Sequence, residues 1–185
     1  HIVISDLIKP TSKESVKALK DSGIDKIVML SGDGKNIADS VSESIGITET
    51  VAEFLPQEKV AKVEELLHTL PAKSKLVFVG DGINDAPVLS NADVGVSMGN
   101  VGSDAAIEAS DIVLASDNLE KLPKLIQISK KTMRIVKENI ALSIFVKVAV
   151  MLLGALGLAS IWLAVFADVG VLILAVLNAL RAFLD

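Results

Sequence analysis

Short apolar runs alternate with amphipathic segments along the first 118 residues of the chain. Such alternation is typical of a parallel β-sheet whose strands are joined by crossover helices. The apolar runs predict strands at residues 2–4, 26–30, 76–79, 94–97 and 111–114. The pattern therefore predicts an α/β fold for this part of the chain.

Three helices are predicted between these strands from their end signals. Thr11-Ser-Lys-Glu14 has the spacing of a capping box, in which the first and fourth side chains satisfy backbone N–H groups at the helix start. We expect this helix to end at Gly23 and a second, over residues 35–45, to end at Gly46, because glycine readily adopts the conformation that closes a helix. Pro56 starts a third helix, where its missing N–H costs nothing.

The last third of the chain has a different pattern. From Leu119 the apolar residues recur at helical spacing through a basic stretch, which predicts one long helix. Residues 140–158 and 161–182 are each close to the roughly 20 residues that span a membrane's hydrocarbon core. A tight turn between them is predicted from Gly154, Gly157 and Ser160. We expect a transmembrane hairpin; the alternative is a buried helical pair of a soluble protein.

The charged residues divide the chain at nearly the same place. Residues 1–137 hold 16 of the 18 Lys and Arg and 20 of the 23 Asp and Glu, whereas residues 140–180 contain only Lys147 and Asp168. Basic residues flank the hairpin on both sides and its turn is uncharged, so the positive-inside rule places both ends in the cytoplasm. We expect a cytoplasmic domain over residues 1–118, a connecting stalk helix over 119–139 and the membrane hairpin over 140–182.

Composition excludes some further classes of site and partner. The chain has no cysteine, which excludes disulfides and thiolate metal sites within it. Its net charge of −5 argues against nucleic acid as a partner. The sequence starts with His1, already inside an apolar run, so we expect it to be part of a longer protein.

Two carboxylates follow the apolar run at residues 76–79. They are Asp81 and Asp85, with glycines on both sides of the first. Ligands of parallel α/β sheets gather beyond the carboxyl ends of the strands, and glycines let an ion or phosphate approach the backbone. We predict that Asp81 ligates Mg²⁺, which prefers one or two protein carboxylates. Asp85 would hold a metal-bound water or orient Asn84; alternatively, it only caps the helix that follows.

Two other segments suit a phosphoryl site. Ser31-Gly32-Asp33 follows the predicted strand at residues 26–30 and offers a hydroxyl and backbone N–H groups to phosphate oxygens. Lys59 would neutralise the charge that develops on a phosphoryl group during transfer. Taken alone, the first segment is also compatible with an ordinary turn, and Lys59 with a solvated surface residue.

The string GDGINDAP, preceded by SGD and PQEKV, resembles the phosphorylation domain of P-type ATPases, a branch of the haloacid dehalogenase superfamily. The resemblance extends from Asp6-Leu-Ile-Lys9-Pro10, similar to the family's Asp-x-x-Arg-Pro hinge motif, to Asn178-Ala-Leu-Arg181. Lys9 stands where the family usually has Arg, and Ser31 where it has Thr; both changes keep the functional group. The resemblance implies an incomplete, Rossmann-like phosphorylation domain of the haloacid dehalogenase type.

The same resemblance implies roles for individual residues. Asp81 and Asp85 would form the Mg²⁺ site, and the residues assigned to the phosphoryl site are Ser31, Gly32, Asp33, Lys59 and Asn84. Asp6 and Lys9 would lie at the junction with a nucleotide-binding domain and contribute to ATP binding.

The family's nucleophile lies in Asp-Lys-Thr-Gly-Thr, a string that this chain lacks. Asp6 also follows an apolar run, but Ile8 and Pro10 occupy places where the superfamily's nucleophile loop carries other residue types. We therefore expect the nucleophile, the nucleotide-binding and actuator domains and the earlier membrane helices to lie upstream of His1. This part of the protein is not expected to hydrolyse ATP unaided.

Lys147 and Asp168 fall within the predicted membrane helices. A charged side chain there costs roughly 2.5–3.5 kcal/mol on insertion scales, which indicates a function. Helix rise places Lys147 about 10 Å and Asp168 about 20 Å from the cytoplasmic edge, too far for direct contact without tilt or side-chain extension. A carboxylate without a thiol nearby suits a divalent cation better than Cu(I). The alternative is a charge pair that only locks the hairpin.

In the heavy-metal class of P-type ATPases, zinc/cadmium/lead pumps carry a Lys in the penultimate helix and Asp-x-Gly in the last. Lys147 and Asp168-Val-Gly170 of this chain resemble these two features. The resemblance implies the C-terminal part of an ATP-driven exporter of Zn²⁺, Cd²⁺ or Pb²⁺ in the plasma membrane, working through an aspartyl-phosphate. Mg²⁺ and ATP would be its cofactors, and lipid and the upstream domains its partners. The alternatives are a membrane-anchored phosphatase of the same superfamily and a non-catalytic membrane module that keeps the fold.

Overall fold

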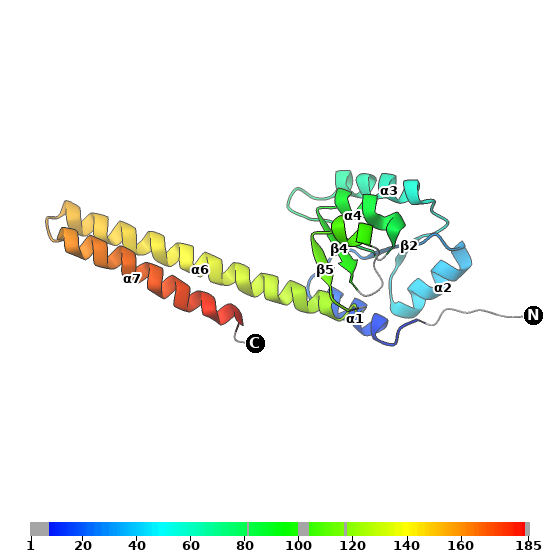
Figure 1. The fold of residues 1–185 in the computed structure, drawn as a ribbon, viewed down its shortest axis with the longest axis horizontal. Helices are drawn as coiled ribbons and strands as arrows, with labels where there is room; N and C mark the ends of the chain where they lie inside the picture. The colour runs from blue at the N-terminus through cyan, green and yellow to red at the C-terminus, as the bar shows by residue number, and fades with distance from the viewer. Residues whose placement is uncertain (1–7, 81, 100–103, 117, 184–185) are drawn as a thin grey trace, which may run out of the picture. The chain divides into compact units, whose positions relative to one another are not determined.

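The computed structural model describes residues 8–80, 82–99, 104–116 and 118–183 (Figure 1). The chain divides into two compact units, residues 1–123 and residues 124–185. The strand predicted at residues 2–4 lies outside the described residues, as do Asp6 and Asp81.

Helices and strands alternate along the first unit. Their order is α1 (Thr11–Asp21), β1 (Val28–Leu30), α2 (Lys35–Ile45), β2 (Glu49–Val51), α3 (Pro56–Thr69), β3 (Val77–Gly80), the 3-10 helix η1 (Ile83–Asp85), α4 (Ala86–Asn91), β4 (Val94–Met98), α5 (Asp104–Glu108) and β5 (Ile112–Leu114). The described strands pair in parallel, β1 with β2 in one sheet and β3-β4-β5 in another. The predicted α/β fold with parallel strands is confirmed.

One local prediction in this unit was wrong, and one strand was missed. The N-cap of α1 is Pro10, so Thr11 already lies inside the helix, and no side chain makes a capping hydrogen bond there. The hydroxyl of Ser15 instead donates to the Thr11 carbonyl oxygen at 2.8 Å. Strand β2 was not predicted, because a strand of three residues is too short to show a clear alternation. The end of α2 agrees with the prediction: its C-cap is Gly46, at a φ of 82°.

The packing around β4 positions the loop after β3. Val96 on β4, Leu114 on β5 and Leu122 at the start of α6 form a buried cluster. Helix α4 packs tightly against β4, since a side chain at Gly95 would come within 2.5 Å of the Leu89 carbonyl oxygen. Because η1 and α4 begin within six residues of the end of β3, this packing holds them at the carboxyl end of that strand.

The second unit is a hairpin of helix α6 (Lys121–Ala155), whose first turn belongs to the first unit, and helix α7 (Ile161–Ala179), followed by the 3-10 helix η2 (Leu180–Phe183). Figure 1 shows α6 and α7 side by side. Gly157 makes the turn at a φ of 73°, a conformation that favours glycine. The hydroxyl of Ser160 caps α7 by accepting the Leu163 N–H at 3.2 Å. Gly154 lies inside α6, and the turn covers residues 156–160, whereas the predicted spans left only residues 159 and 160 between them.

Both long helices have the length and composition of membrane spans. Their most apolar 18-residue windows have mean hydropathies of 1.7 in α6 and 2.4 in Ile161–Phe183. Only 0% and 6% of these windows are buried in the structure, whereas the core helices of a soluble protein would be mostly buried. The exposed apolar surface therefore favours the membrane hairpin over the buried helical pair.

Candidate functional site

An ion pair joins two of the predicted phosphoryl-site residues. The Lys59 Nζ atom on α3 lies 3.0 Å from Asp85 Oδ1 at the end of η1, although the two residues are 26 positions apart in sequence. Their side chains are only 18% and 12% exposed. A largely covered ion pair needs well-placed partners, because removing charges from water is costly. The fold thus brings together two residues that were singled out separately.

Asp85 does more than cap a helix. It occupies the N-cap position of α4, as the alternative reading required, but its side chain makes no capping hydrogen bond there. One carboxylate oxygen pairs with Lys59 instead. Asp85 therefore lies at the start of α4, while its side chain is bound to Lys59.

Gly80 is required by its contact with Asp85. A Cβ atom at Gly80 would lie 2.9 Å from Asp85 Cβ and 3.0 Å from Asp85 Oδ2. A Cβ atom at Gly82 would lie 3.5 Å from the same oxygen, which is ordinary van der Waals contact. The first glycine therefore lets the carboxylate pack against the strand end, and the second leaves modest space beside Oδ2.

Ser31 and Asp33 form a small hydrogen-bonded loop after β1. The Ser31 hydroxyl donates to Asp33 Oδ2 at 2.9 Å and accepts the Asp33 backbone N–H at 3.1 Å. Two backbone hydrogen bonds attach this loop to the segment after β2. The Phe54 N–H donates to the backbone carbonyl oxygen of Ser31, and the Glu53 N–H donates to that of Asp33. The hydroxyl lies at the strand end, as predicted, but must rotate away from Asp33 to donate to a phosphate oxygen.

Of the remaining predicted residues of this region, two are exposed and two lie outside the described residues. Asn84 lies in η1 and is exposed. Lys9 is also exposed, immediately before α1, and its carbonyl oxygen accepts the Ser12 N–H. Asp6 and Asp81 are outside the described residues, so their predicted roles stay predictions.

The described residues fit a hard cation such as Mg²⁺. Asp85 Oδ1 is paired with Lys59, whereas an added Cβ atom at Gly82 would lie 3.5 Å from Oδ2, which leaves modest space on that side. Carboxylate oxygen is the ligand type that Mg²⁺ prefers, and Asp81 precedes Gly82 in the sequence. The carboxylate donor and the space beside Gly82 are both compatible with the predicted ion.

The hairpin contains a second Lys–Asp pair, in a direct contact that was predicted only with tilt or side-chain extension. Lys147 Nζ on α6 lies 3.3 Å from Asp168 Oδ1 on α7. The predicted separation assumed that the first helix continues to residue 158, but α6 ends at Ala155. Lys147 therefore lies eight residues before its helix ends and Asp168 seven after its helix begins, so both are at nearly the same level.

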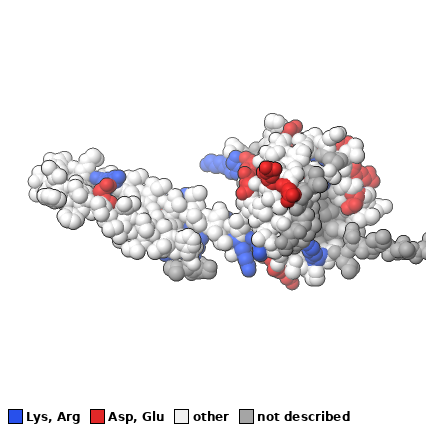
Figure 2. Space-filling view, viewed as in Figure 1, with Lys and Arg blue, Asp and Glu red and all other residues white. Residues whose placement is uncertain are grey.

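This pair is exposed within an apolar surface. The two side chains are 68% and 69% exposed, and they border a groove of about 450 Å³ between α6 and α7 with Val150, Met151, Ala164 and Val165. In Figure 2 the outer part of the hairpin is white apart from one place where blue and red meet. The hairpin thus exposes one acidic and one basic side chain beside apolar residues.

Two polar residues that the sequence reasoning did not single out are Glu138 and Asn139. Both form hydrogen bonds across the hairpin with the Asn178-Ala-Leu-Arg181 string. A signal was available, since an acid and an amide interrupt the apolar periodicity just before residue 140.

Known proteins resemble the chain over nearly its whole length. The model of a hydrolase family described as haloacid dehalogenase-like hydrolase matches residues 1–93. A zinc-transporting ATPase of Synechocystis sp. is 50% identical over 98% of this chain and 25% of its own length. A cadmium, zinc and cobalt-transporting ATPase of Bacillus subtilis is 52% identical over 97% of this chain and 26% of its own. The chain thus spans about a quarter of the length of these relatives.

Solved structures agree with the sequence comparisons. The structure of a zinc-transporting PIB-type ATPase in its E2.Pi state matches 96% of this chain and 28% of its own, with a TM-score of 0.88 and 34% identity. A Haemophilus influenzae phosphatase matches 64% of this chain with a TM-score of 0.54 but only 18% identity, which shows a shared fold alone. The predicted resemblance to zinc/cadmium-transporting P-type ATPases is confirmed, as is the haloacid dehalogenase-type fold.

Proposed function

Because the chain belongs to the haloacid dehalogenase-like hydrolase family, we propose that it forms the C-terminal part of a P-type ATPase that exports divalent heavy-metal ions. The relatives are named as transporters of zinc, cadmium or cobalt. We propose Zn²⁺, Cd²⁺ and Pb²⁺ as the exported ions: the first two are named for the relatives, the resemblance of Lys147 and Asp168-Val-Gly170 adds the third, and carboxylate oxygen suits divalent cations better than Cu(I).

The observation that carries this proposal is the contact between Lys147 and Asp168. A phosphatase with a membrane anchor has no use for charges among apolar helices, where each is costly. In this chain the acid and the base come from different helices, meet at 3.3 Å and border a groove. We propose that Asp168 binds the exported ion and that Lys147 neutralises the carboxylate when the ion has left.

The phosphoryl site would be assembled at the carboxyl ends of the strands. We propose that Asp81 and Asp85 would hold Mg²⁺, which would supply charge neutralisation for phosphoryl transfer to an aspartate of the full-length protein. Lys59, held in place by Asp85, would contact the phosphoryl oxygens. Ser31 would donate its hydroxyl to another oxygen, with Gly32 and Asp33 shaping the loop and Asn84 beside it. Asp6 and Lys9 would face the ATP-binding domain.

A single helix connects the two kinds of site. Helix α6 starts next to β5, includes Leu122 of the buried cluster and continues to Lys147 without interruption. We propose that it transmits the change at the phosphoryl site to the ion pair. The proposed division is a cytoplasmic domain over residues 1–118, a stalk over 119–139 and a plasma-membrane hairpin over 140–182.

The experiment that tests this function is ATP-dependent ion uptake into inside-out vesicles that contain the full-length protein. We expect uptake of Zn²⁺, Cd²⁺ or Pb²⁺ in the wild type, and loss of uptake in Asp168→Ala with the protein still in the membrane. Unchanged uptake in Asp168→Ala would remove the assignment of the transport site. ATP hydrolysis without any ion uptake would instead favour the membrane-anchored phosphatase.

A further inference from the structure

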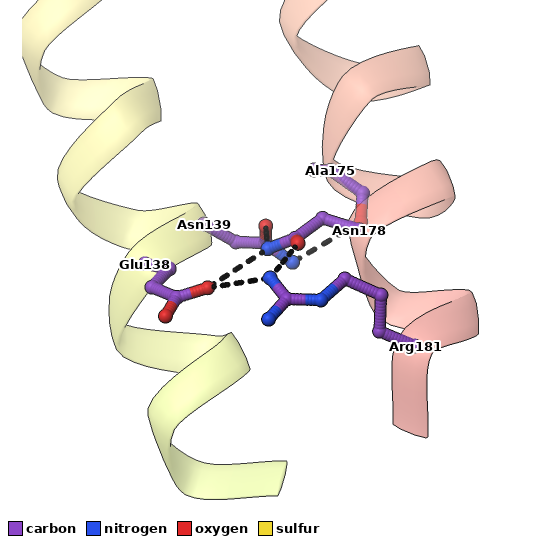
Figure 3. A network of polar contacts seen from close by, with 5 residues as sticks. All are labelled: Glu138, Asn139, Ala175, Asn178 and Arg181. Carbon is purple, nitrogen blue, oxygen red and sulfur yellow. Dashed lines mark hydrogen bonds and ion pairs between the residues drawn. The ribbon is translucent and has the colours of Figure 1, made fainter. Parts of the chain in front are cut away.

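A polar network joins the two helices at the end of the hairpin away from its turn. It consists of the side chains of Glu138 and Asn139 on α6, Asn178 on α7 and Arg181 on η2, and we call it the polar clamp (Figure 3). These four side chains point toward one another across the gap between the helices.

Asn178 is the centre of the clamp. Its Nδ2 donates to Asn139 Oδ1 at 2.9 Å and approaches Glu138 Oε2 at 3.4 Å, while its Oδ1 accepts from Arg181 at 2.7 Å. Arg181 also donates to Glu138 Oε2 at 3.1 Å. Each of the four side chains therefore forms a hydrogen bond with at least one other side chain of the clamp.

Asn139 makes the bond that depends most strictly on helix position. Its Nδ2 donates to the backbone carbonyl oxygen of Ala175 at 3.1 Å. A backbone oxygen is fixed to its helix and cannot follow a sliding partner as a long side chain can. This bond therefore reports how α6 and α7 are aligned along their axes.

The same alignment sets the contact of Lys147 with Asp168. Lys147 follows Asn139 by eight residues on α6, and Asp168 precedes Ala175 by seven on α7. In an antiparallel pair, nearly equal steps in opposite directions, here eight and seven residues, lead from one contact to the other. Sliding one helix by a single residue moves its side chains about 1.5 Å along the axis. Such a shift would lengthen or misalign the 3.3 Å contact.

The surfaces between these two contacts do little to fix the alignment themselves. Of the buried or partly buried positions there, Ser143, Val146, Gly170, Val171 and Ala175 are small or short, and Leu142 alone is larger. Small residues let helices approach closely, but they provide few large side chains that would resist sliding. Directional hydrogen bonds at one end are then the main feature that sets the alignment.

We propose that the polar clamp is a positioning device: it holds α6 and α7 in the alignment that brings Lys147 against Asp168, and so tunes the affinity of the ion site. This inference rests on the proposed function, in which Asp168 binds the exported ion. Glu138, Asn139, Asn178 and Arg181 are positioning residues and do not contact the ion.

The first test replaces Asn178 by leucine, which is similar in size but has no hydrogen-bonding groups, in the full-length protein. We expect the zinc concentration for half-maximal ATPase stimulation to rise about three- to tenfold, the effect of losing one or two hydrogen bonds between membrane helices. The maximal rate at saturating zinc should be retained. Leu177→Ala, on an exposed neighbour, is the matched control and should leave both values unchanged. A wild-type half-saturation value in Asn178→Leu would overturn the inference.

The second test keeps the charges but exchanges their places. Glu138→Arg alone should raise the half-saturating zinc concentration, and adding Arg181→Glu should restore much of the loss, because the ion pair is rebuilt in reverse. The double variant keeps the number of positive charges at this end of the hairpin, so a role of Arg181 in membrane orientation alone would be unaffected. If the double variant is worse than Glu138→Arg, the ion-pair part of the clamp is wrong, even if Asn178→Leu fails to fold.

Asp168→Ala, measured in parallel, separates the two proposals. If zinc stimulation persists in Asp168→Ala, the proposed function fails and the clamp has no ion site to position. If Asp168→Ala abolishes stimulation while Asn178→Leu and the charge exchange have no effect, only the clamp inference fails.

Discussion

The two units each contain a Lys–Asp pair, and the pairs differ mainly in their surroundings. Lys59 and Asp85 meet at 3.0 Å and are mostly covered by the α/β domain itself. Lys147 and Asp168 meet at 3.3 Å and are about two-thirds exposed on an apolar hairpin. The domain thus supplies most of the environment of the first pair, whereas the second faces outward. A pair presented in this way is suited to respond to an ion, and a covered pair to hold its geometry constant.

The largest expected effect is on phosphoenzyme formation, when Asp81, four residues before Asp85 of the covered pair, is substituted. Asp81→Asn keeps the size of the side chain but weakens a Mg²⁺ ligand, so phosphoenzyme formation from ATP in the full-length protein should fall about a hundredfold or more. Asp93→Asn, which changes an acid next to β4, is the control. Normal phosphoenzyme levels in Asp81→Asn at ordinary Mg²⁺ concentration would show that the ligand assignment is wrong.

The exposed pair should respond differently to loss of its base. Lys147→Met leaves the carboxylate of Asp168 without compensation once the ion has departed, which slows ion release. We expect the maximal zinc-stimulated rate to fall about tenfold, equivalent to roughly 1.4 kcal/mol, with no increase in the half-saturating zinc concentration. A large increase in that concentration at an unchanged maximal rate would instead make Lys147 part of ion binding.

The two glycines beside Asp85 should differ in their tolerance of a methyl group. Gly80→Ala places a Cβ atom 2.9 Å from Asp85 Cβ, so the carboxylate must move. Overpacking of this kind costs about 1–3 kcal/mol, and we expect a lower thermal unfolding midpoint together with less phosphoenzyme. In Gly82→Ala the nearest contact is 3.5 Å, and both effects should be clearly smaller. Equal effects of the two substitutions would contradict the packing described for Gly80.

The smallest expected effect is on acid stability. A hydrogen bond from Lys75, together with one from the Leu76 backbone N–H, holds the pKa of Asp93 below its ordinary value. A carboxyl group with a lowered pKa stabilises the folded state above its unfolded pKa, about 3.9, and this contribution is lost as the pH falls through its folded pKa. Asp93→Asn should therefore lower the unfolding temperature slightly at pH 6, and the difference from wild type should shrink below about pH 4. A constant difference across this range would exclude a titrating Asp93.

The parts of the fold that the sequence predicted well have strong local causes. Gly46 ends α2 in the left-handed conformation, and Pro56 starts α3, because each residue restricts the backbone by itself. The capping box at Thr11 failed because Pro10 took the N-cap position, a competition that spacing alone does not reveal. Strand β2 depends on pairing with β1, which is not a local property.

The sequence identified residues of the candidate site but not the contacts between them. GDGINDAP and Lys59 were identified separately, but the ion pair between Lys59 and Asp85 spans 26 residues and depends on how α3 packs against α4. The contact of Lys147 with Asp168 was not expected without tilt or side-chain extension, because it depends on where α6 ends, and this helix ends at Ala155 rather than at the predicted residue 158. The polar clamp was missed since its residues lie about 40 positions apart in sequence and meet only when α6 and α7 pair.

The central claim is that an ion at Asp168 controls phosphorylation at a distant aspartate. Its most direct test is phosphoenzyme formation from ATP in the full-length protein, measured with and without zinc in the wild type and in Asp168→Ala. We predict that zinc stimulates phosphoenzyme formation in the wild type and has no effect in Asp168→Ala. Equal zinc stimulation in both proteins would contradict the claim.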